Sequence, residues 1–117
     1  MKAMILDKIC KLPEDKKPLS PADIPMPVPN EGEILVKVSA CGVCHTELDE
    51  IEGRTPPPSY PVIPGHQIVG TVVEKGKCVE GLRIGERVGI GWIYAACGKC
   101  RFCISGDDNL CERFEAK

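Results

Sequence analysis

The sequence predicts a mainly β domain, either a sandwich or a partly open antiparallel β-barrel with short helices. The first indication is a series of short β-branched segments separated by turns, in 117 residues that include 12 glycines and 11 prolines. The second is that only one short segment has a helical pattern. The length fits a single domain over residues 1–117. The sequence has no G-x-G-x-x-G fingerprint, so we expect no dinucleotide-binding fold within these residues.

The N-terminal part of the chain predicts two extended segments and one strong strand. Residues 3–9 are an apolar-rich opening segment. Residues 18–29 contain five prolines. Because proline has no backbone N–H, this stretch is predicted to be an extended edge or a surface connection. Residues 33–40 predict the best strand, since apolar side chains occupy every second position from Ile34 to Ala40 and so share one face.

The remaining chain predicts one helix, one rigid loop and two further strands. We expect a short helix over residues 46–52, which Gly53 ends. Residues 56–64 carry five prolines, so they are predicted to form a rigid loop. The β-branched segments 68–74 and 87–93 predict two strands.

Composition and charge exclude several classes of function. Fifteen basic and seventeen acidic residues give a net charge of -2, and aromatic residues make up 4%. Neither a basic patch nor a base-stacking surface is therefore expected, and we predict no nucleic-acid partner. Asp7 interrupts the first apolar segment, and no later one is long enough to cross a membrane. We expect a cytoplasmic protein, in which cysteines act as metal ligands or free thiols and not as disulfides.

A cluster of four cysteines near the end of the sequence is the strongest motif. Two C-x-x-C steps share one cysteine, and the fourth follows after seven residues, which gives Cys97, Cys100, Cys103 and Cys111. Four thiolates suit a tetrahedral zinc without an open position, and such a site is structural. Iron is the main alternative, but bacterial ferredoxins, which also start with C-x-x-C-x-x-C, place their fourth cysteine after three residues and before a proline. A set of free thiols is the other alternative.

A second candidate site combines Cys44, which follows the best predicted strand, with His66, which precedes the next one. A thiolate and an imidazole are both good zinc ligands. Taken singly, the cysteine could be a small core residue and the histidine could satisfy a hydrogen bond. Cys41 and Cys44 form another C-x-x-C step, but it lies too far from Cys97 for a zinc ribbon.

Together these motifs resemble the N-terminal catalytic domain of the zinc-dependent medium-chain alcohol dehydrogenases. The resemblance covers essentially the whole chain and rests on motifs that occur in order, namely Cys44-His45-Thr46, Gly65-His66, Gly85-Glu86-Arg87-Val88 and the four-cysteine segment. It implies a GroES-like, partly open antiparallel β-barrel with the structural-zinc lobe as an excursion.

The resemblance also implies roles for individual residues. Cys44 and His66 would be ligands of a catalytic zinc with an open position, where the metal stabilises an alkoxide and lowers the pKa of the alcohol. Thr46 would hydrogen-bond the alcohol and begin a proton relay, although a threonine here could also cap the helix. His45 would approach the pyrophosphate of the coenzyme, NAD or NADP. Glu47 would orient His66 through its other ring nitrogen.

Four positions need separate comment. Trp92 matches a residue that lines the substrate pocket, and its alternative role is that of a core aromatic. Gln67 replaces a glutamate that relatives carry after the histidine. Asp49 stands where many relatives have the histidine that ends the proton relay, and a carboxylate there has a lower pKa. We assign no chemistry to three further cysteines, Cys10, Cys41 and Cys78.

The family's third catalytic ligand and its whole coenzyme-binding Rossmann domain lie beyond residue 117. We therefore expect a fragment, inactive by itself, with the catalytic zinc site weak or incomplete. The substrate of the full enzyme would be a small alcohol or aldehyde, with no membrane partner and a possible homo-oligomeric assembly. The alternative is a stand-alone zinc-binding or protein-interaction module without enzymatic activity. An enzyme portion should expose an apolar surface beside Cys44 and His66, whereas a dedicated module should not.

Overall fold

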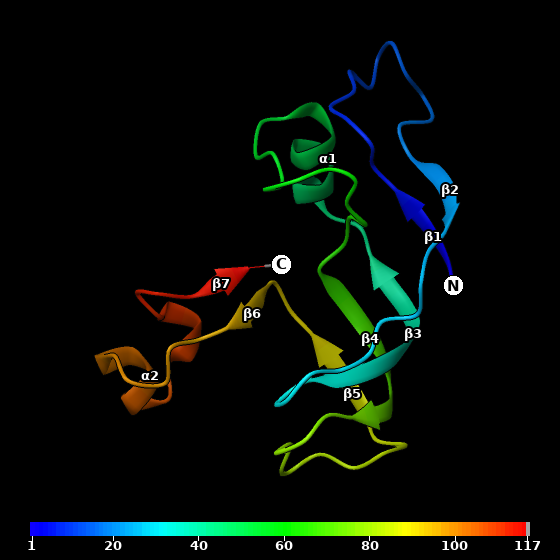
Figure 1. The fold of residues 1–117 in the computed structure, drawn as a ribbon. Helices are drawn as coiled ribbons and strands as arrows, with labels where there is room; N and C mark the ends of the chain where they lie inside the picture. Colours follow the sequence, from blue (N-terminus) through cyan, green and yellow to red (C-terminus); the bar gives the residue numbers. More distant parts are fainter. Residues whose placement is uncertain (117) are drawn as a thin grey trace.

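The computed structural model describes residues 1–116 and contains three small antiparallel sheets and few helices (Figure 1). The two-stranded first sheet pairs β1 (Lys2–Ile5) with β2 (Ser20–Asp23). The central sheet has the order β3 (Ile34–Gly42), β4 (Gln67–Lys75) and β5 (Arg87–Ile90). The third pairs β6 (Ile93–Ala95) with β7 (Glu115–Ala116). The helical elements are α1 (His45–Glu52), α2 (Arg101–Ser105) and the 3-10 turn Asp108–Leu110. The mainly β prediction is confirmed, and the sheets do not close into a barrel.

The predicted strand at residues 33–40 is confirmed as β3, but its expected single buried face is wrong. The pairing with β4 shifts register twice, between Leu35 and Val36 and again between Val38 and Ala40. The first shift leaves an extra residue in β4, Val73, and the second leaves one in β3, Ser39, so the regular alternation of sides is broken. The strand is partly buried only at its first three residues, and Val38 is 54% exposed. Regular alternation in the sequence carries no signal for these bulges.

The predicted strand at residues 87–93 divides into two. Arg87–Ile90 extends the central sheet as β5, where Val88 lies opposite Gly70. The chain then leaves this sheet and forms β6, which pairs with β7. The structure therefore uses Gly91 as the point where the chain passes from the central sheet toward the four-cysteine lobe.

The proline-rich segment forms an edge, as predicted. Pro21 lies in β2 opposite Met4 in β1. A two-stranded sheet leaves the outer side of each strand unpaired, so a proline here removes no required hydrogen bond.

A glycine that follows β4 allows a close backbone contact with the segment before β3. The backbone N–H of Gly76 donates to the carbonyl of Glu33 at 2.8 Å, and a Cβ at Gly76 would lie 1.7 Å from the carbonyl oxygen of Asn30. Only glycine allows that approach.

The main core is small and lies between the opening segment and α1. It contains Leu6, Cys10 and Ile51, with four partly buried side chains packed against them, from Leu12, Leu19, Tyr60 and Val62. Leu6 and Val62 also exchange backbone hydrogen bonds of 2.8 and 3.0 Å. This core holds α1 against the segment that follows β1. Val72 in β4 is the other fully buried large side chain.

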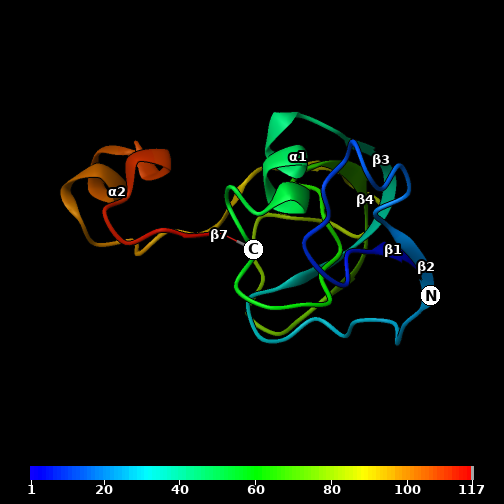
Figure 2. The same cartoon turned by 90° about the horizontal axis from the view of Figure 1, so that it is seen from above.

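The molecule is more open than a self-sufficient domain of its size. Its accessible surface is 8525 Å², whereas a folded monomer of this mass exposes about 6,200 Å². Its radius of gyration is 16.0 Å, against about 13 Å for a compact chain of this length. The lobe around α2 stands apart from the remaining elements (Figure 2). Among the residues that the structure describes, no helix is long and apolar enough to cross a membrane.

Candidate functional site

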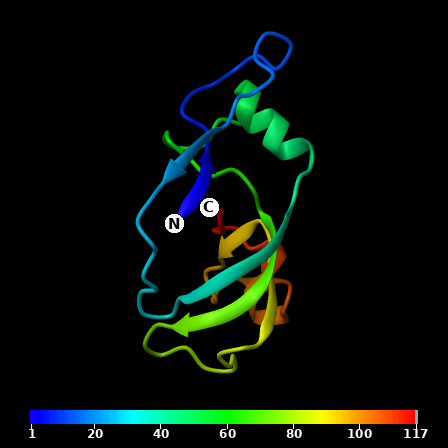
Figure 3. The ribbon, with the colours of Figure 1, turned by 90° about the vertical axis from the view of Figure 1, so that its right-hand side faces the viewer.

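The first candidate site begins where β3 runs into α1 (Figure 3). Cys44 is the N-cap of α1, and its sulfur accepts the backbone N–H of Thr46 at 3.4 Å. In return, the backbone N–H of Cys44 donates to Oε2 of Glu47 at 2.6 Å, which completes a capping box. The cap is therefore Cys44 and not Thr46, which leaves the threonine hydroxyl free of that role. At the other end, Gly53 ends the helix in the left-handed conformation, as predicted.

The irregular segment before β4 brings His66 to Cys44. Gly65 has a φ of +127°, and a Cβ there would lie 2.6 Å from the sulfur of Cys41, so this position requires glycine. The sulfur of Cys44 lies 3.5 Å from Nε2 of His66. A tetrahedral zinc with one sulfur and one nitrogen ligand separates these atoms by about 3.6 Å. The two side chains therefore fit an ion bound between them.

Glu47 faces the opposite nitrogen of the imidazole. Its Oε1 lies 2.8 Å from Nδ1 of His66, and the two side chains are 6% and 13% exposed. Oε1 is buried and accepts no well-aligned hydrogen bond from the described residues, so a proton on Nδ1 would satisfy it and leave Nε2 for the metal. Burial raises the pKa of Glu47, but backbone N–H groups of Cys44 and Glu47 outweigh it and hold the pKa below its usual value.

A cleft of about 440 Å³ opens beside this pair. Thr46, His66 and Trp92 line it, together with the proline-rich loop 55–59 and residues 62–65. Trp92 is 50% exposed and packs on Phe114, with ring centroids 5.1 Å apart and planes at 54°. It is therefore a cleft residue and not a core aromatic. Gln67 does not line this cleft and begins β4 opposite Gly42.

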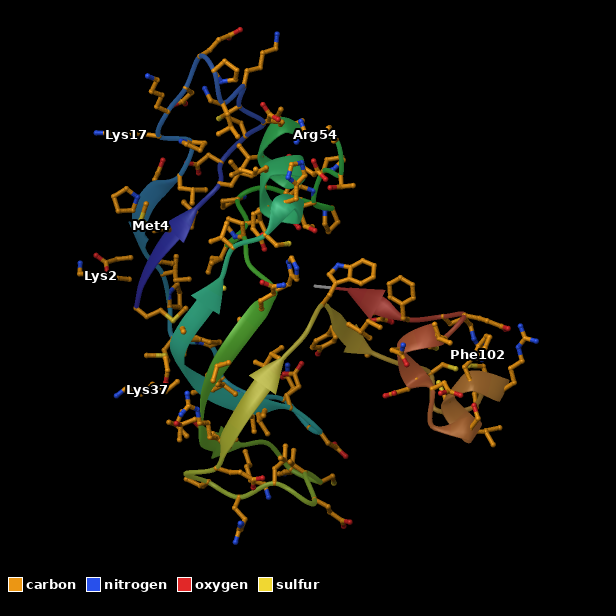
Figure 4. The ribbon with its side chains drawn as sticks, turned by 180° about the vertical axis from the view of Figure 1, so that it is seen from behind. Lys2, Met4, Lys17, Lys37, Arg54 and Phe102 are labelled. Atoms are coloured by element: carbon orange, nitrogen blue, oxygen red, sulfur yellow. The ribbon has the colours of Figure 1, made fainter. Side chains whose placement is uncertain are left out.

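The outer side of α1 carries two other predicted residues. The side chain of His45 is 80% exposed, with Nε2 3.9 Å from Oδ1 of Asp49. Asp49 also pairs with Arg54 and does not line the cleft. Arg54 lies at the C-terminal end of α1, far from Phe102 in the lobe (Figure 4). The structure thus places Asp49 outside the cleft, next to Arg54 and His45.

The cleft contains one carboxylate that the sequence reasoning missed, that of Glu50. It follows Thr46 by four residues, and this helical spacing puts both side chains on one face. The spacing is a signal that could have identified it. Burial, and then the neighbouring charge of Glu47, raise the pKa of Glu50.

The second site is the lobe between β6 and β7, which contains α2 (Figure 1). All four ligand atoms of Cys97, Cys100, Cys103 and Cys111 lie within 4.8 Å of one another. The sulfur of Cys103 lies 4.0 Å from that of Cys97 and 3.5 Å from that of Cys100, and the sulfurs of Cys100 and Cys111 are 4.0 Å apart. Tetrahedral zinc with four thiolates places its sulfurs about 3.8 Å apart. The cluster therefore has the dimensions of a structural zinc site.

The electrostatics of the lobe favour thiolates at part of the cluster. The sulfur of Cys111 accepts backbone N–H groups from Cys97 and Arg113, each at 3.3 Å. A hydrogen bond from the backbone of Lys99 is the main cause that lowers the pKa of Cys97 to about 6. Burial, followed by the neighbouring sulfur groups, raises the pKa of Cys103 to about 12. A bound cation would lower the pKa of all four cysteines, because it stabilises every thiolate around it.

The remaining cysteines belong to neither cluster. Cys10 is buried in the core, whereas Cys41 and Cys78 are exposed, and every cysteine in the chain is a free thiol.

A comparison with known families identifies the family of this chain. The sequence profile of the family described as "Alcohol dehydrogenase GroES-like domain" matches residues 30–116. The chain belongs to the alcohol dehydrogenase family. The predicted resemblance and the GroES-like fold are both confirmed.

Individual alcohol dehydrogenases support this membership. The chain is 46% identical over 114 residues to an alcohol dehydrogenase of Geobacillus stearothermophilus, covering 97% of this chain and 32% of the relative. It superposes with a TM-score of 0.82 and 28% identity on a cobalt- and zinc-bound thermostable alcohol dehydrogenase of Pyrobaculum aerophilum, covering 96% and 32% of the two chains. An E. coli CFT073 alcohol dehydrogenase complexed with NADH matches with a TM-score of 0.78 and 30% identity, covering 100% and 32%.

These coverages define the part of an alcohol dehydrogenase that the chain represents. It spans about a third of the length of the relatives it matches. The matched portion is catalytic-domain-like, and its neighbours include enzymes with zinc and with a nicotinamide coenzyme bound. The described residues supply one cluster that fits a structural zinc and a second cluster of Cys44, Glu47 and His66.

Proposed function

We propose that this chain provides the substrate-side part of a zinc-dependent alcohol dehydrogenase that interconverts a small alcohol and its aldehyde or ketone with NAD or NADP. The observation that carries the proposal is the 3.5 Å separation of the Cys44 sulfur and Nε2 of His66 beside an open cleft. Zinc bound there would supply Lewis acidity, which lowers the pKa of an alcohol. Four lobe cysteines would hold a separate structural zinc, namely Cys97, Cys100, Cys103 and Cys111.

The residues around this pair have distinct tasks in the proposal. Alcohol oxidation removes a hydride, which the coenzyme accepts, and a proton, which the protein must transfer. Thr46 lines the cleft, so its hydroxyl can hydrogen-bond the alcohol and begin a relay, in which it takes up that proton while it passes its own on toward water. Glu47 orients His66 from the far side of the ring. His45 is exposed on the outer side of α1, where it is available to a coenzyme phosphate.

We further propose that the isolated chain is inactive. Cys44 and His66 leave at least one ligand position to be supplied from outside the described residues, and no coenzyme fold lies among them. The large exposed surface supports this proposal over a stand-alone zinc module. Exposed apolar side chains include Val43 at 78% and Ile63 at 47%, near the ends of α1 and of the cleft loop. Apolar surface of this extent is typical of a face that another domain covers.

The test is a chimera in which this chain replaces the matching segment of the Geobacillus stearothermophilus alcohol dehydrogenase. The chimera should reduce NAD(P) with a small alcohol, whereas the isolated chain should not. Cys44→Ser in the chimera should abolish turnover, and Cys78→Ser, at an exposed thiol outside both clusters, should retain it. A folded, zinc-loaded chimera without turnover would contradict the proposal, as would NAD(P)-dependent turnover by the isolated chain.

A further inference from the structure

The cleft beside the candidate zinc site has one negatively charged wall residue with no partner. Glu50 and Thr46 line the cleft from the same face of α1, while most of the other lining side chains are apolar. The carboxylate of Glu50 is partly buried. It makes no hydrogen bond or ion pair with any of the residues from 1 to 116.

Unlike Glu50, the other two carboxylates on the last turn of α1 have a cationic partner. Asp49 and Glu52 both pair with Arg54, which partly offsets their charges at the helix end. Glu50 receives no such cation. Two charged groups of the site act on the pKa of Glu50: Glu47, which raises it, and His66, which lowers it. A carboxylate on an apolar wall with neither a cation nor a donor gains most from a ligand that brings one.

The apolar part of the wall makes this preference selective. Pro56, Pro57 and Ile63 line the cleft near Glu50 and offer no side-chain donor or acceptor. A purely hydrocarbon alcohol would cover the Glu50 carboxylate without replacing its hydration, which costs free energy. An alcohol with a second donor group would satisfy it. Polar groups in a pocket discriminate strongly in this way, because the wrong ligand leaves them unpaired.

We propose that Glu50 is a specificity-determining residue, which selects alcohols that carry a second hydrogen-bond donor a few atoms from the reacting hydroxyl. The donor is either an ammonium, as in an amino alcohol, or another hydroxyl, as in a diol. This inference rests on the proposed function, since it assumes that the reacting hydroxyl lies near Cys44 and His66 with Thr46. The raised pKa of Glu50 agrees with it, because burial in an unpaired state raises the pKa of a carboxyl group.

The test compares three alcohols of equal size on the zinc-loaded chain. The probes are 1-butanol, 1,3-propanediol and 3-amino-1-propanol, titrated while the NMR signals of the cleft residues are followed. Glu50→Gln removes the charge and keeps the shape. Glu52→Gln is the matched control, because it removes the same charge from the same helix outside the cleft. Glu50→Leu is a second variant, whose cleft should prefer 1-butanol.

The expected result is a change of preference and not a general loss of binding. In Glu50→Gln the Kd of 3-amino-1-propanol should rise about tenfold and that of 1,3-propanediol about threefold, with 1-butanol unchanged. Glu52→Gln should leave all three values as in the wild type. If the wild type, Glu50→Gln and Glu50→Leu all show the same preference among the three alcohols, the inference about Glu50 is overturned but the proposed function is not. If the zinc-loaded wild type binds none of the three alcohols in the cleft, the inference about Glu50 is overturned, whereas the proposed function is decided separately by the turnover of the chimera. If Glu52→Gln changes the Kd values as much as Glu50→Gln does, the effect comes from long-range electrostatics and not from contact in the cleft. That result would also overturn the assignment of Glu50 as the specificity-determining residue.

Discussion

Oε1 of Glu47 lies 2.8 Å from Nδ1 of His66, and the same carboxylate accepts the backbone N–H of Cys44 through Oε2 at 2.6 Å. One side chain therefore connects both candidate zinc ligands, although they are 22 residues apart in sequence. It fixes the start of α1 at one end and the plane of the imidazole at the other. Several consequences of this arrangement can be measured.

Glu47→Gln should weaken metal binding at the Cys44–His66 pair. The amide keeps the size of the side chain but loses the charge that favours a proton on Nδ1, and partners of this kind are worth about 10- to 100-fold in metal affinity. The measurement is a cobalt titration followed by its absorption bands, after the lobe has been filled with zinc. Glu52→Gln on the outer side of the same helix should bind cobalt as the wild type does. Unchanged affinity in Glu47→Gln would show that His66 needs no such orientation.

Glu47 should also give the domain an acid-sensitive contribution to stability. Its pKa in the folded chain is below the ordinary value of 4.5. The free energy that this shift contributes is therefore fully present above about pH 4.5 and is lost as the pH falls through the folded value. Urea unfolding of the metal-free chain between pH 6 and pH 3 should show a smaller acid loss of stability in Glu47→Gln than in the wild type. Glu80→Gln, at an exposed position, is the control. An identical acid slope in all three chains would contradict the prediction.

The sequence predicted those features of the fold that depend on local chemistry. The helix that ends at Gly53, the proline-rich edge that became β2, and the central strands β3 and β4 all follow from backbone rules or residue preferences. The two register shifts between β3 and β4 and the division at Gly91 were not predictable in this way. They reflect how β3 pairs with β4 and how the lobe forms its own small sheet. Both depend on contacts between residues distant in sequence.

The candidate site was likewise predictable from the sequence only in part. The pairing of Cys44 with His66 was expected from the family resemblance, and the structure brings them to 3.5 Å. Their role as zinc ligands stays a prediction. The structure added which side chains share a face of α1: Glu50 lines the cleft with Thr46, while Asp49 turns outward to Arg54. The proline-rich loop forms the facing wall of the cleft, and its position cannot be read from helical spacing.

The lobe should hold the more tightly bound zinc. Cys103→Ser removes one of four ligands whose sulfurs already have tetrahedral spacing, so the variant should lose the zinc that survives mild chelation in the wild type. Cys78→Ser is the matched control, since Cys78 is exposed and outside both clusters. Zinc content after chelation should be one per chain in the wild type and control and near zero in Cys103→Ser. Two zincs that both resist chelation would show that the Cys44–His66 pair has a further strong ligand, for which Glu47 is the available group.

Leu6→Ala should destabilise the domain far more than a comparable change on the open sheet. Leu6 is fully buried in the cluster with Cys10 and Ile51, which holds the opening segment against α1. Removing its side chain leaves a cavity, and such changes cost about 2–5 kcal/mol. Val38→Ala in β3 is the control, because Val38 is 54% exposed and should change stability by about 0.5 kcal/mol or less. The measurement is the free energy of unfolding in urea for the zinc-loaded chains. Equal costs for the two variants would mean that this small core does not support α1, and that the position of Cys44 depends on the surrounding protein instead.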